Sequence, residues 1–477
     1  MSTVSSFVSP AHVATPSAAR DLPLPVLGSE LSVPLVTGEH ARYVNLDYAA
    51  SAPCLRSVYD AVATLLPWYS SVHRGSGFAS TVTTEIYSAA RASVAHFVGA
   101  RPDDTVVFTR NTTDALNLLA SALPPDTTVV TFASEHHANL LPWRRGRHVH
   151  LPVPRSTDEA IARAEAALAA LPSRHRLLAV TGASNVTGEI WPLEALAQVA
   201  HRHGARFAVD AAQLAPHRAI DMAALDADYL AISGHKLYAP FGAGVLVGRR
   251  DWLDEAQPYL AGGGAVRNVT VDFTEWADGH ARHEAGTPNV VGAAALAAAC
   301  GALERAGMDR VAAHEAELLA RLTSGLADLP GVEILSCFDA AGHPPSERIG
   351  VVAFNVIGWH HGALAAALGA EYGVGVRSGA FCAHPLCATL AASSGAVRAS
   401  FGAGSTLAEI ERFLAATTEL LTHGARWHYR IDGGRHVPDP DPRPRPRLHH
   451  DLGRIAHGTT PPPVASDSPC LAIRPNN

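Results

Sequence analysis

The stretch YLAISGHKLY, residues 229–238, runs from an apolar segment into the only lysine of this 477-residue chain, Lys236. The chain holds 37 Lys and Arg residues, and the other 36 are arginines. An arginine stays protonated at any working pH, whereas a lysine can lose its proton and attack a carbonyl carbon. The lone lysine therefore predicts a reactive amine at this position, with retention by chance as the alternative.

Apolar runs of strand length alternate with helical patterns around this stretch, from about Asp47 to Ala261. Amphipathic helical patterns lie between several of these runs, for example at 158–171 and 193–203. The apolar runs are residues 105–108, 127–132, 177–181, 206–209, 229–232 and 244–247. Strands separated by helices predict parallel strands joined by crossover connections, with helices on both faces of the sheet. We expect an α/β fold in which residues 41–290 form a large domain around a mainly parallel sheet.

The segments on either side of this domain differ in pattern. Two Ala-rich helical patterns at 290–306 and 308–326 lead into short strands and helices, which predict a smaller C-terminal α+β domain over residues 291–430. Residues 1–40 lack periodicity and predict a flexible lead-in, with one docking segment as a further expectation. Ten prolines predict a Pro-rich, extended or disordered tail at residues 431–477.

The composition indicates a globular protein and argues against several classes of partner. With 47% hydrophobic and 17% charged residues, the chain can form two sizeable cores. A formal net charge of −7, without a stripe of basic residues among aromatics, argues against nucleic-acid binding. We find no signal-peptide pattern and no uninterrupted apolar run of about 18 residues, so we expect neither export nor a membrane span. Six cysteines at irregular spacings favour a reduced, cytoplasmic location.

Polar side chains follow two successive strands of the predicted sheet. Asp210 and Gln213 follow one apolar run, and Ser233 and His235 stand beside Lys236 after the next. The carboxyl ends of parallel strands form the ligand-binding edge of open α/β sheets. A carboxylate there can keep a pyridine nitrogen protonated, which makes the ring an electron sink once a lysine is bound to the ring's aldehyde. Asp210 and Lys236 thus predict pyridoxal phosphate as cofactor, and a helix cap is the alternative role for Asp210.

Two further motifs follow strand ends in the same half of the chain. In RNTTDALN, residues 110–117, Thr112 and Thr113 stand where a helix would begin, and the N–H groups and hydroxyls at a helix N-terminus can hold a phosphate. Simple N-capping explains the same residues. In SEHHANLLPW, His136 or His137 could stack on a flat ring and carry protons. No set of Cys, His or carboxylate residues stands around these histidines at zinc-ligand spacing, so we expect no metal.

These residues are part of a set of motifs that is similar to one known family. Over residues 42–422 the chain resembles the class V aminotransferase-like, fold type I pyridoxal phosphate enzymes, and among them the group II cysteine desulfurases and selenocysteine lyases. The motifs that carry the resemblance, in the family's order, are HRG (73–75), NTTD (111–114), EHHAN (135–139), SNVTG (184–188), DAAQ (210–213), SGHKLY (233–238), EAGTPN (284–289) and VRSGAFCAHPL (376–386). The resemblance implies a homodimeric enzyme of fold type I.

The resemblance also implies how the cofactor would be held. Lys236 would bind it covalently, His136 would stack on its ring, and Asp210 would face the pyridine nitrogen. Gln213 and Asn185 would lie near the phenolic oxygen or the substrate. The phosphate would be held by Thr112, Thr113, Ser233, His235 and, from the neighbouring subunit, Thr287.

The same resemblance implies a substrate and a reaction. Arg398 would pair with the substrate carboxylate in a bidentate manner, although a buried structural salt bridge is the alternative for this residue. Further substrate contacts would come from Arg377, Asn185 and His73. Cys382 would take the sulfur of L-cysteine as a persulfide, or act on L-selenocysteine, while L-alanine is released, with Lys236 and His136 as the other catalytic residues. A sulfur-acceptor protein would then take the sulfur.

Departures from the family pattern keep other activities open. Ala380 and Phe381 stand where the desulfurases often carry two polar residues, Ser71 replaces the Asn that usually opens the HRG motif, and Cys387 is an additional thiol. Related enzymes use this scaffold as β-lyases, epimerases or aminotransferases, in which Cys382 would be incidental. A non-catalytic scaffold, with the proline-rich tail as its functional part, is the alternative from a different class.

Overall fold

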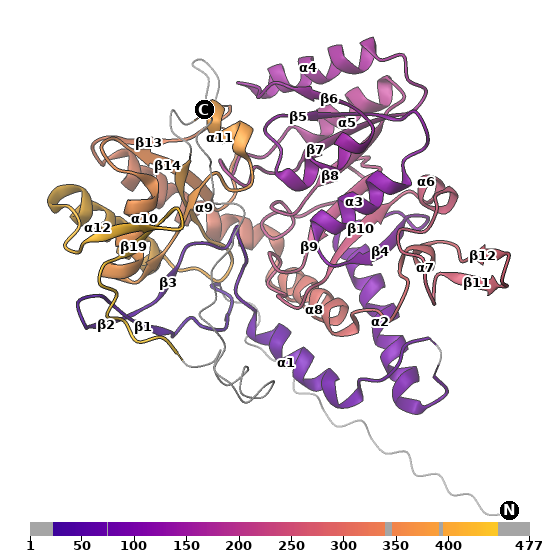
Figure 1. Ribbon diagram of the computed structural model, residues 1–477, viewed down its shortest axis with the longest axis horizontal. Coiled ribbons are helices and arrows are strands. Elements are labelled where there is room, and N and C mark those ends of the chain that lie inside the picture. The colour runs from indigo at the N-terminus through magenta and orange to yellow at the C-terminus, as the bar shows by residue number, and fades with distance from the viewer. Residues whose placement is uncertain (1–21, 74, 339–345, 391–394, 447–477) are drawn as a thin grey trace, which may run out of the picture.

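The computed structural model describes residues 22–73, 75–338, 346–390 and 395–446. Figure 1 shows two lobes, a larger one around a seven-stranded sheet and a smaller one around a four-stranded sheet. The predicted α/β class, with a large domain and a smaller C-terminal one, agrees with this arrangement.

The sheet of the large lobe has the strand order β4-β10-β9-β8-β7-β5-β6. Its strands are β4 (Thr105–Thr109), β5 (Thr128–Phe132), β6 (Arg147–Leu151), β7 (Arg176–Thr181), β8 (Arg206–Asp210), β9 (Tyr229–Ser233) and β10 (Gly244–Gly248). Every predicted apolar run is a strand here, and β6 is an additional edge strand. β10 runs antiparallel to both β4 and β9, since the connection 234–243 contains no helix to carry the chain back across the sheet. The sheet is therefore mainly, but not wholly, parallel.

Helices cover both faces of this sheet, as the pattern predicts. On one face α3 (Thr112–Ala122) and α6 (Arg250–Glu255) share an apolar core with the sheet. On the other face the core includes α4 (Thr157–Ala170), α5 (Leu193–Arg202) and α8 (Val290–Ala306). Neighbouring strand residues enter opposite cores; Val129, for example, belongs to the first and Val130 to the second. This period of two explains why the strands read as continuous apolar runs.

Three further features complete the large lobe and connect it to the small lobe. α1 (Arg56–Leu65) and α2 (Phe78–Phe97) pack against α8. The hairpin of β11 (Val266–Val269) and β12 (Thr274–Trp276) projects from the lobe, followed by α7 (His280–His283) (Figure 1). α8 turns at Gly307 into α9 (Met308–Ala327). Among the described residues no single helix is long and apolar enough to span a membrane, although α8 and α9, bent by 79°, meet that criterion as a pair.

The small lobe is built on an antiparallel sheet with the strand order β13-β14-β17-β16. Its strands are β13 (Val332–Ile334), β14 (Val351–Val356), β16 (Arg377–Gly379) and β17 (Ala396–Ser400). An apolar core joins this sheet to α9, α10 (His361–Tyr372) and α12 (Leu407–His423). In the register of β16 against β17, Arg377 lies directly opposite Arg398.

The N-terminal segment contributes to the folded body from residue 22 onward. Leu24 and Val26 are buried, and β1 (Ser32–Pro34) pairs with β2 (His40–Arg42). β3 (Val44–Asn45) then pairs in parallel with β15 (Val374–Gly375) of the small lobe. Residues 22–40 therefore differ from a flexible lead-in and agree with the docking segment that the prediction allowed, since isolated apolar residues dock there without forming a periodic pattern. Residues 1–21 lie outside the described part.

The segment after α12 also differs from the prediction. β18 (Tyr429–Asp432) and β19 (Arg435–Pro438) form a hairpin around Gly433 and Gly434, both at positive φ, and β19 packs on α10. Buried Glu371 accepts hydrogen bonds from the backbone of Arg426 and from the hydroxyl of Tyr429. The predicted extended tail is thus wrong for residues 431–438, because the prolines begin only at the end of the hairpin; residues 447–477 lie outside the described part.

Candidate active site

A cavity of about 210 Å³ lies at the carboxyl ends of β7, β8 and β9. Thr181, Asp210 and Ser233, the last residues of these strands, line it. The predicted site residues that line it are Thr112, Thr113, His136, Asn185, Asp210, Gln213, Ser233, His235, Lys236, Arg377, Cys382 and Arg398. Side chains from both lobes therefore meet at one place, as expected for the ligand-binding edge of an open α/β sheet.

Lys236 and Asp210 both line this cavity, and each influences the pKa of the other. Burial lowers the pKa of Lys236 to about 8, and the negative charge of Asp210 opposes that shift. Burial raises the pKa of Asp210, and the charge of Lys236 opposes it in turn. Asp210 also accepts a hydrogen bond from the backbone N–H of Ala212 at 3.0 Å, which fixes the carboxylate at the strand end. Lys236 thus has an amine that is partly uncharged near neutral pH, the form that attacks carbonyl carbons.

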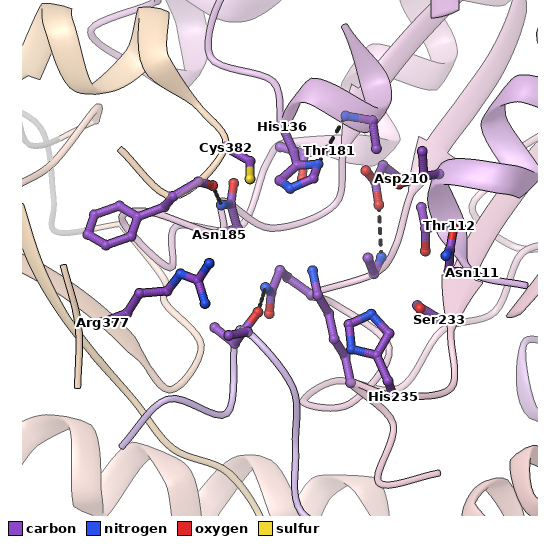
Figure 2. A pocket seen from close by; sticks show the side chains of 18 of the residues that line it. Asn111, Thr112, His136, Thr181, Asn185, Asp210, Ser233, His235, Arg377 and Cys382 are labelled. Atoms are coloured by element: carbon purple, nitrogen blue, oxygen red, sulfur yellow. Dashed lines mark hydrogen bonds between the residues drawn. The ribbon is translucent and has the colours of Figure 1, made fainter. Parts of the chain in front are cut away.

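One end of the cavity is built to receive an anion. α3 begins there, and the side chain of Asn111 caps it by accepting from the backbone N–H of Asp114 at 3.0 Å. The hydroxyls of Thr112 and Ser233 are buried and find no hydrogen-bond partner among the described residues. Figure 2 shows Asn111, Thr112, Ser233 and His235 around this end. Since a buried hydroxyl without a partner is costly, and a helix N-terminus favours anions, this end fits a phosphate group.

His136 projects into the cavity between the phosphate end and Cys382 (Figure 2). Its Nδ1 accepts the backbone N–H of Ala138 at 3.0 Å, and burial, followed by the charge of Lys236, lowers its pKa to about 3. The ring is therefore neutral near pH 7. A neutral, desolvated imidazole is suited to pack flat against another ring, which supports the stacking role predicted for it.

Glu135, for which the sequence suggested no separate role, anchors the segment that carries His136. Its carboxylate is fully buried and accepts hydrogen bonds from Asn139 Nδ2 at 2.7 Å and from the backbone N–H of Thr181 at 3.1 Å. Burial raises the pKa of Glu135 to about 8. Its place within the motif EHHAN, which also contains its partner Asn139, was the only signal of its importance, since Thr181 lies 46 positions further along the chain.

The opposite end of the cavity holds two arginines. Arg398 is 2% exposed and donates from Nη1 to the carbonyl oxygen of Asn185 at 2.8 Å and from Nη2 to Asp47 at 3.0 Å. Its Nε finds no partner among the described residues. Arg377, its neighbour across the strands, lies 3.7 Å from the same Asp47 carboxylate. Asp47 was not predicted from the sequence, because only the fold brings this N-terminal residue to the arginines.

Cys382 reaches the cavity on a loop between β16 and α11 (His384–Leu390). Phe381 and Cys382 have φ of +50° and +56°, a left-handed conformation that non-glycine residues seldom adopt. Asn185 Nδ2 donates to the carbonyl of Phe381 at 2.7 Å, and the backbone N–H of His137 donates to that of Cys382 at 2.8 Å. Cys382 is partly exposed. The loop thus holds a thiol in the cavity by contacts from the large lobe.

Cys387, the second thiol of this region, has a different environment. It is 1% exposed, and burial raises its pKa to about 12. A buried thiol that keeps its proton is a poor nucleophile, so the geometry distinguishes it from Cys382.

Two predicted residues do not line this cavity in their own chain. His73 and Thr287 line a second cavity of about 580 Å³, together with Glu284. For Thr287 this is compatible with the predicted role in a neighbouring subunit, which stays a prediction. His73, on the loop before α2, does not line the Lys236 cavity of its own chain, and its substrate contact stays a prediction. Within the described ranges no group of three or more His, Cys, Asp or Glu residues could hold a metal ion.

Comparison with known proteins shows to which protein family this chain belongs. Residues 44–413 match the family model described as Aminotransferase class-V. The chain belongs to this family. A cysteine desulfurase of Dickeya dadantii is 37% identical over 390 residues, which cover 80% of this chain and 92% of the relative. A probable cysteine desulfurase of Halobacterium salinarum is 37% identical over 388 residues, covering 79% and 91%.

Two solved structures of cysteine desulfurases agree with the sequence relatives. The apo structure of a cysteine desulfurase from Thermococcus onnurineus matches with a TM-score of 0.73 and 35% identity, covering 80% of this chain and 95% of that one. The cysteine desulfurase CsdA of Escherichia coli, in an S-sulfonic acid form, matches with a TM-score of 0.70 and 33% identity over the same shares. The predictions of family and of fold type I are confirmed.

The class-V family depends on pyridoxal phosphate, and the residues of this chain fit that cofactor. The partnerless hydroxyls of Thr112 and Ser233 suit its phosphate. The buried carboxylate of Asp210 suits its pyridine nitrogen, and the amine of Lys236 suits its aldehyde. The prediction of the cofactor is confirmed at the level of the family.

Proposed function

We propose that this protein is a pyridoxal phosphate-dependent cysteine desulfurase, which converts L-cysteine or L-selenocysteine to L-alanine and receives the sulfur of cysteine on Cys382. The observation that carries the proposal is the position of Cys382. Its strained loop opens into the same cavity as Lys236 and Arg398. A β-lyase, epimerase or aminotransferase would have no use for a thiol held there at a cost in backbone strain.

Lys236, Asp210 and His136 have different roles at the end of the cavity where the cofactor would bind. Lys236 accepts and returns a proton at the substrate's Cα, since its pKa of about 8 allows both forms near neutral pH. Asp210 and His136 line the cavity. Asp210 would keep the ring nitrogen of bound pyridoxal phosphate protonated, and His136 would pack on that ring and exclude water. The cofactor, when bound, supplies the electron sink that makes the Cα proton removable.

The two arginines select a substrate with a carboxylate. Arg398 has an unsatisfied Nε that faces a buried environment, and Arg377 lies opposite it on the neighbouring strand. A guanidinium group can bind a carboxylate through two hydrogen bonds, which fixes orientation as well as position. The substrate's carboxylate therefore binds at this end, with its amino group toward Lys236 and its side chain toward Cys382.

The sulfur step balances without an external oxidant or reductant. The thiolate of Cys382 attacks Sγ of the substrate, an S–S bond forms, and the Cβ–Sγ bond breaks with its electron pair left on Cβ. A proton then replaces sulfur at Cβ, and L-alanine is released. The sum is L-cysteine plus the Cys382 thiol giving L-alanine plus the Cys382 persulfide.

The proposal extends to assembly and to a partner. We propose a homodimer in which Thr287 completes the phosphate site of the neighbouring subunit; its position in a second cavity, away from Lys236, supports this. A sulfur-acceptor protein would take the persulfide sulfur from the partly exposed Cys382. The cytoplasmic location stays a prediction.

The test of this function is a product assay with the cofactor-loaded protein. L-cysteine, L-selenocysteine and cysteine S-conjugates are supplied separately, and alanine, sulfide or selenide, and pyruvate are measured. The desulfurase produces alanine from cysteine in the presence of a thiol reductant. Pyruvate and ammonia in place of alanine would indicate a β-lyase, and racemised substrate an epimerase.

A further inference from the structure

The loop that carries Cys382 is tied at two points to the segment that carries His136. This segment continues as a short 3-10 helix at His137–Asn139. The backbone N–H of His137 donates to the carbonyl of Cys382 at 2.8 Å. The side chains form a second link, because Nδ1 of His384 lies 3.0 Å from Nε2 of His137. The two imidazole rings are nearly parallel, at 7°.

The link between the two histidines is a hydrogen bond that needs one proton between the facing nitrogens. Two neutral rings satisfy this requirement, with one nitrogen donating and the other accepting. Burial, followed by the charges of His384 and Arg144, lowers the pKa of His137, which favours the neutral ring. His136 is the other neighbouring imidazole, with a centroid 6.2 Å from that of His137.

The Cys382 loop needs such links because its conformation is unfavourable in isolation. Phe381 and Cys382 both have positive φ, and such residues keep that conformation only where the surroundings impose it. Before the cysteine, Asn185 holds the carbonyl of Phe381 at 2.7 Å. After it, the next polar side chain along the chain is that of His384, two residues on, where α11 begins.

We infer that His384 is a positioning residue for the reaction: its hydrogen bond to His137 holds the thiol of Cys382 toward the cavity. The inference rests on the proposed role of Cys382 as sulfur acceptor. It makes the persulfide-forming thiol and the stacking residue His136 parts of one rigid unit. Loss of the link would leave the carboxylate-binding arginines in place but let the thiol leave its position of attack.

The experiment compares His384→Ala with His384→Asn in the purified, cofactor-loaded protein. Asparagine keeps a hydrogen-bonding atom near the Nδ1 position, whereas alanine removes it. His148→Ala is the matched control, because His148 lies beside another histidine, His150, with ring centroids 4.7 Å apart, and neither lines the cavity. The readouts are the rate at which iodoacetamide alkylates Cys382 without substrate, followed by peptide mass spectrometry, and kcat and KM for cysteine.

We expect His384→Ala to raise the alkylation rate severalfold and to lower kcat by about tenfold or more with little change in KM. His384→Asn and His148→Ala should behave like the wild type in both. Wild-type alkylation in His384→Ala, or an Asn variant as impaired as the Ala variant, would overturn the inference. Because alkylation needs no turnover, it gives an answer even if the protein proves not to be a desulfurase. Should His384→Ala fail to retain cofactor, His137→Ala and His137→Gln replace the pair, since glutamine places its amide near Nε2.

Discussion

Arg398 donates from Nη2 to Oδ1 of Asp47 over 3.0 Å, a contact between residues 351 positions apart in the chain. The other oxygen of that carboxylate lies 3.7 Å from Nη1 of Arg377. One carboxylate from the N-terminal segment thus holds two guanidinium groups that face each other across β16 and β17. It offsets the repulsion between them and leaves the Nε of Arg398 for a substrate.

This arrangement predicts that Asp47→Asn impairs substrate binding more than the chemical steps. A charge-assisted hydrogen bond contributes about 1.5–3 kcal/mol, so we expect KM for cysteine to rise by about tenfold or more while kcat stays within about threefold. Steady-state kinetics of the variant measure both constants. Asp103→Asn is the control, since Asp103 is a largely exposed carboxylate that also faces an arginine. An unchanged KM in Asp47→Asn would show that the arginines need no such support.

A second prediction concerns the amine of Lys236 in the cofactor-free protein. Burial lowers its pKa to about 8 from the ordinary 10.5, so its reactivity toward an acylating reagent should rise through about pH 8. Since the chain has one lysine, only the α-amino group competes, and peptide mapping separates the two. Asp210→Asn should move the midpoint lower, because the charge of Asp210 raises this pKa. A midpoint near 10.5, or an upward movement in Asp210→Asn, would contradict the assignment of these two residues as a pair.

Glu135 gives a prediction about stability and pH. Burial raises its pKa in the folded protein to about 8, above the ordinary value of 4.5. Between about pH 4.5 and pH 8, the Glu135 carboxyl is therefore protonated in the folded protein and ionised in the unfolded chain. Its contribution to stability is therefore present at low pH and is lost as the pH rises toward 8. Glu135→Gln has no such titration. Denaturant unfolding at about pH 5.5 and about pH 8 should show wild type losing stability relative to Glu135→Gln, and a pH-independent difference would count against a buried, proton-binding Glu135.

The hairpin of β18 and β19 predicts that the folded body extends beyond Arg430. A chain that ends at Arg430 loses β19, which packs on α10, and α10 leads directly into β15 and β16. We expect its Tm to be lower by about 5 °C or more than that of a chain ending at Pro446, which keeps the hairpin. Equal melting temperatures for the two truncated chains would mean that the hairpin adds nothing to the stability of the small lobe.

Much of the fold could be predicted from the sequence because buried strands between helices have a distinctive pattern. β6 (RHVHL) escaped prediction because an edge strand with polar residues has no apolar run. The direction of β10 depends on a connection that lacks a helix, and the apolar run alone does not reveal it. The docking of residues 22–40 depends on contacts with distant parts of both lobes, such as the backbone bonds of Leu27 to Cys54 and of Val36 to Ala370. The hairpin after Arg430 depends on its packing against α10, and local patterns contain neither set of contacts.

The site was predictable to the extent that its residues stand in motifs at strand ends. Lys236 was found from composition, and Asp210 and Thr112 from their positions after apolar runs. Asp47 and Glu135 were not assigned roles, since Asp47 acts through Arg398, 351 positions away, and Glu135 holds Thr181, 46 positions away. The link between His137 and His384 likewise joins residues 247 positions apart, and only the folded chain brings them together.

The central claim is that Cys382 receives sulfur from cysteine, and trapping the enzyme during turnover tests it most directly. Rapid alkylation after addition of L-cysteine, followed by peptide mass spectrometry with fragmentation, locates any added sulfur. We predict one extra sulfur atom on Cys382 and none on the buried Cys387, with Cys387→Ala still forming the persulfide and Cys382→Ala losing alanine and sulfide production from cysteine. Selenocysteine could still react in Cys382→Ala, since selenium is the better leaving group. An unmodified Cys382 in the trapped wild type, together with cysteine desulfuration by Cys382→Ala at the wild-type rate, would contradict the account.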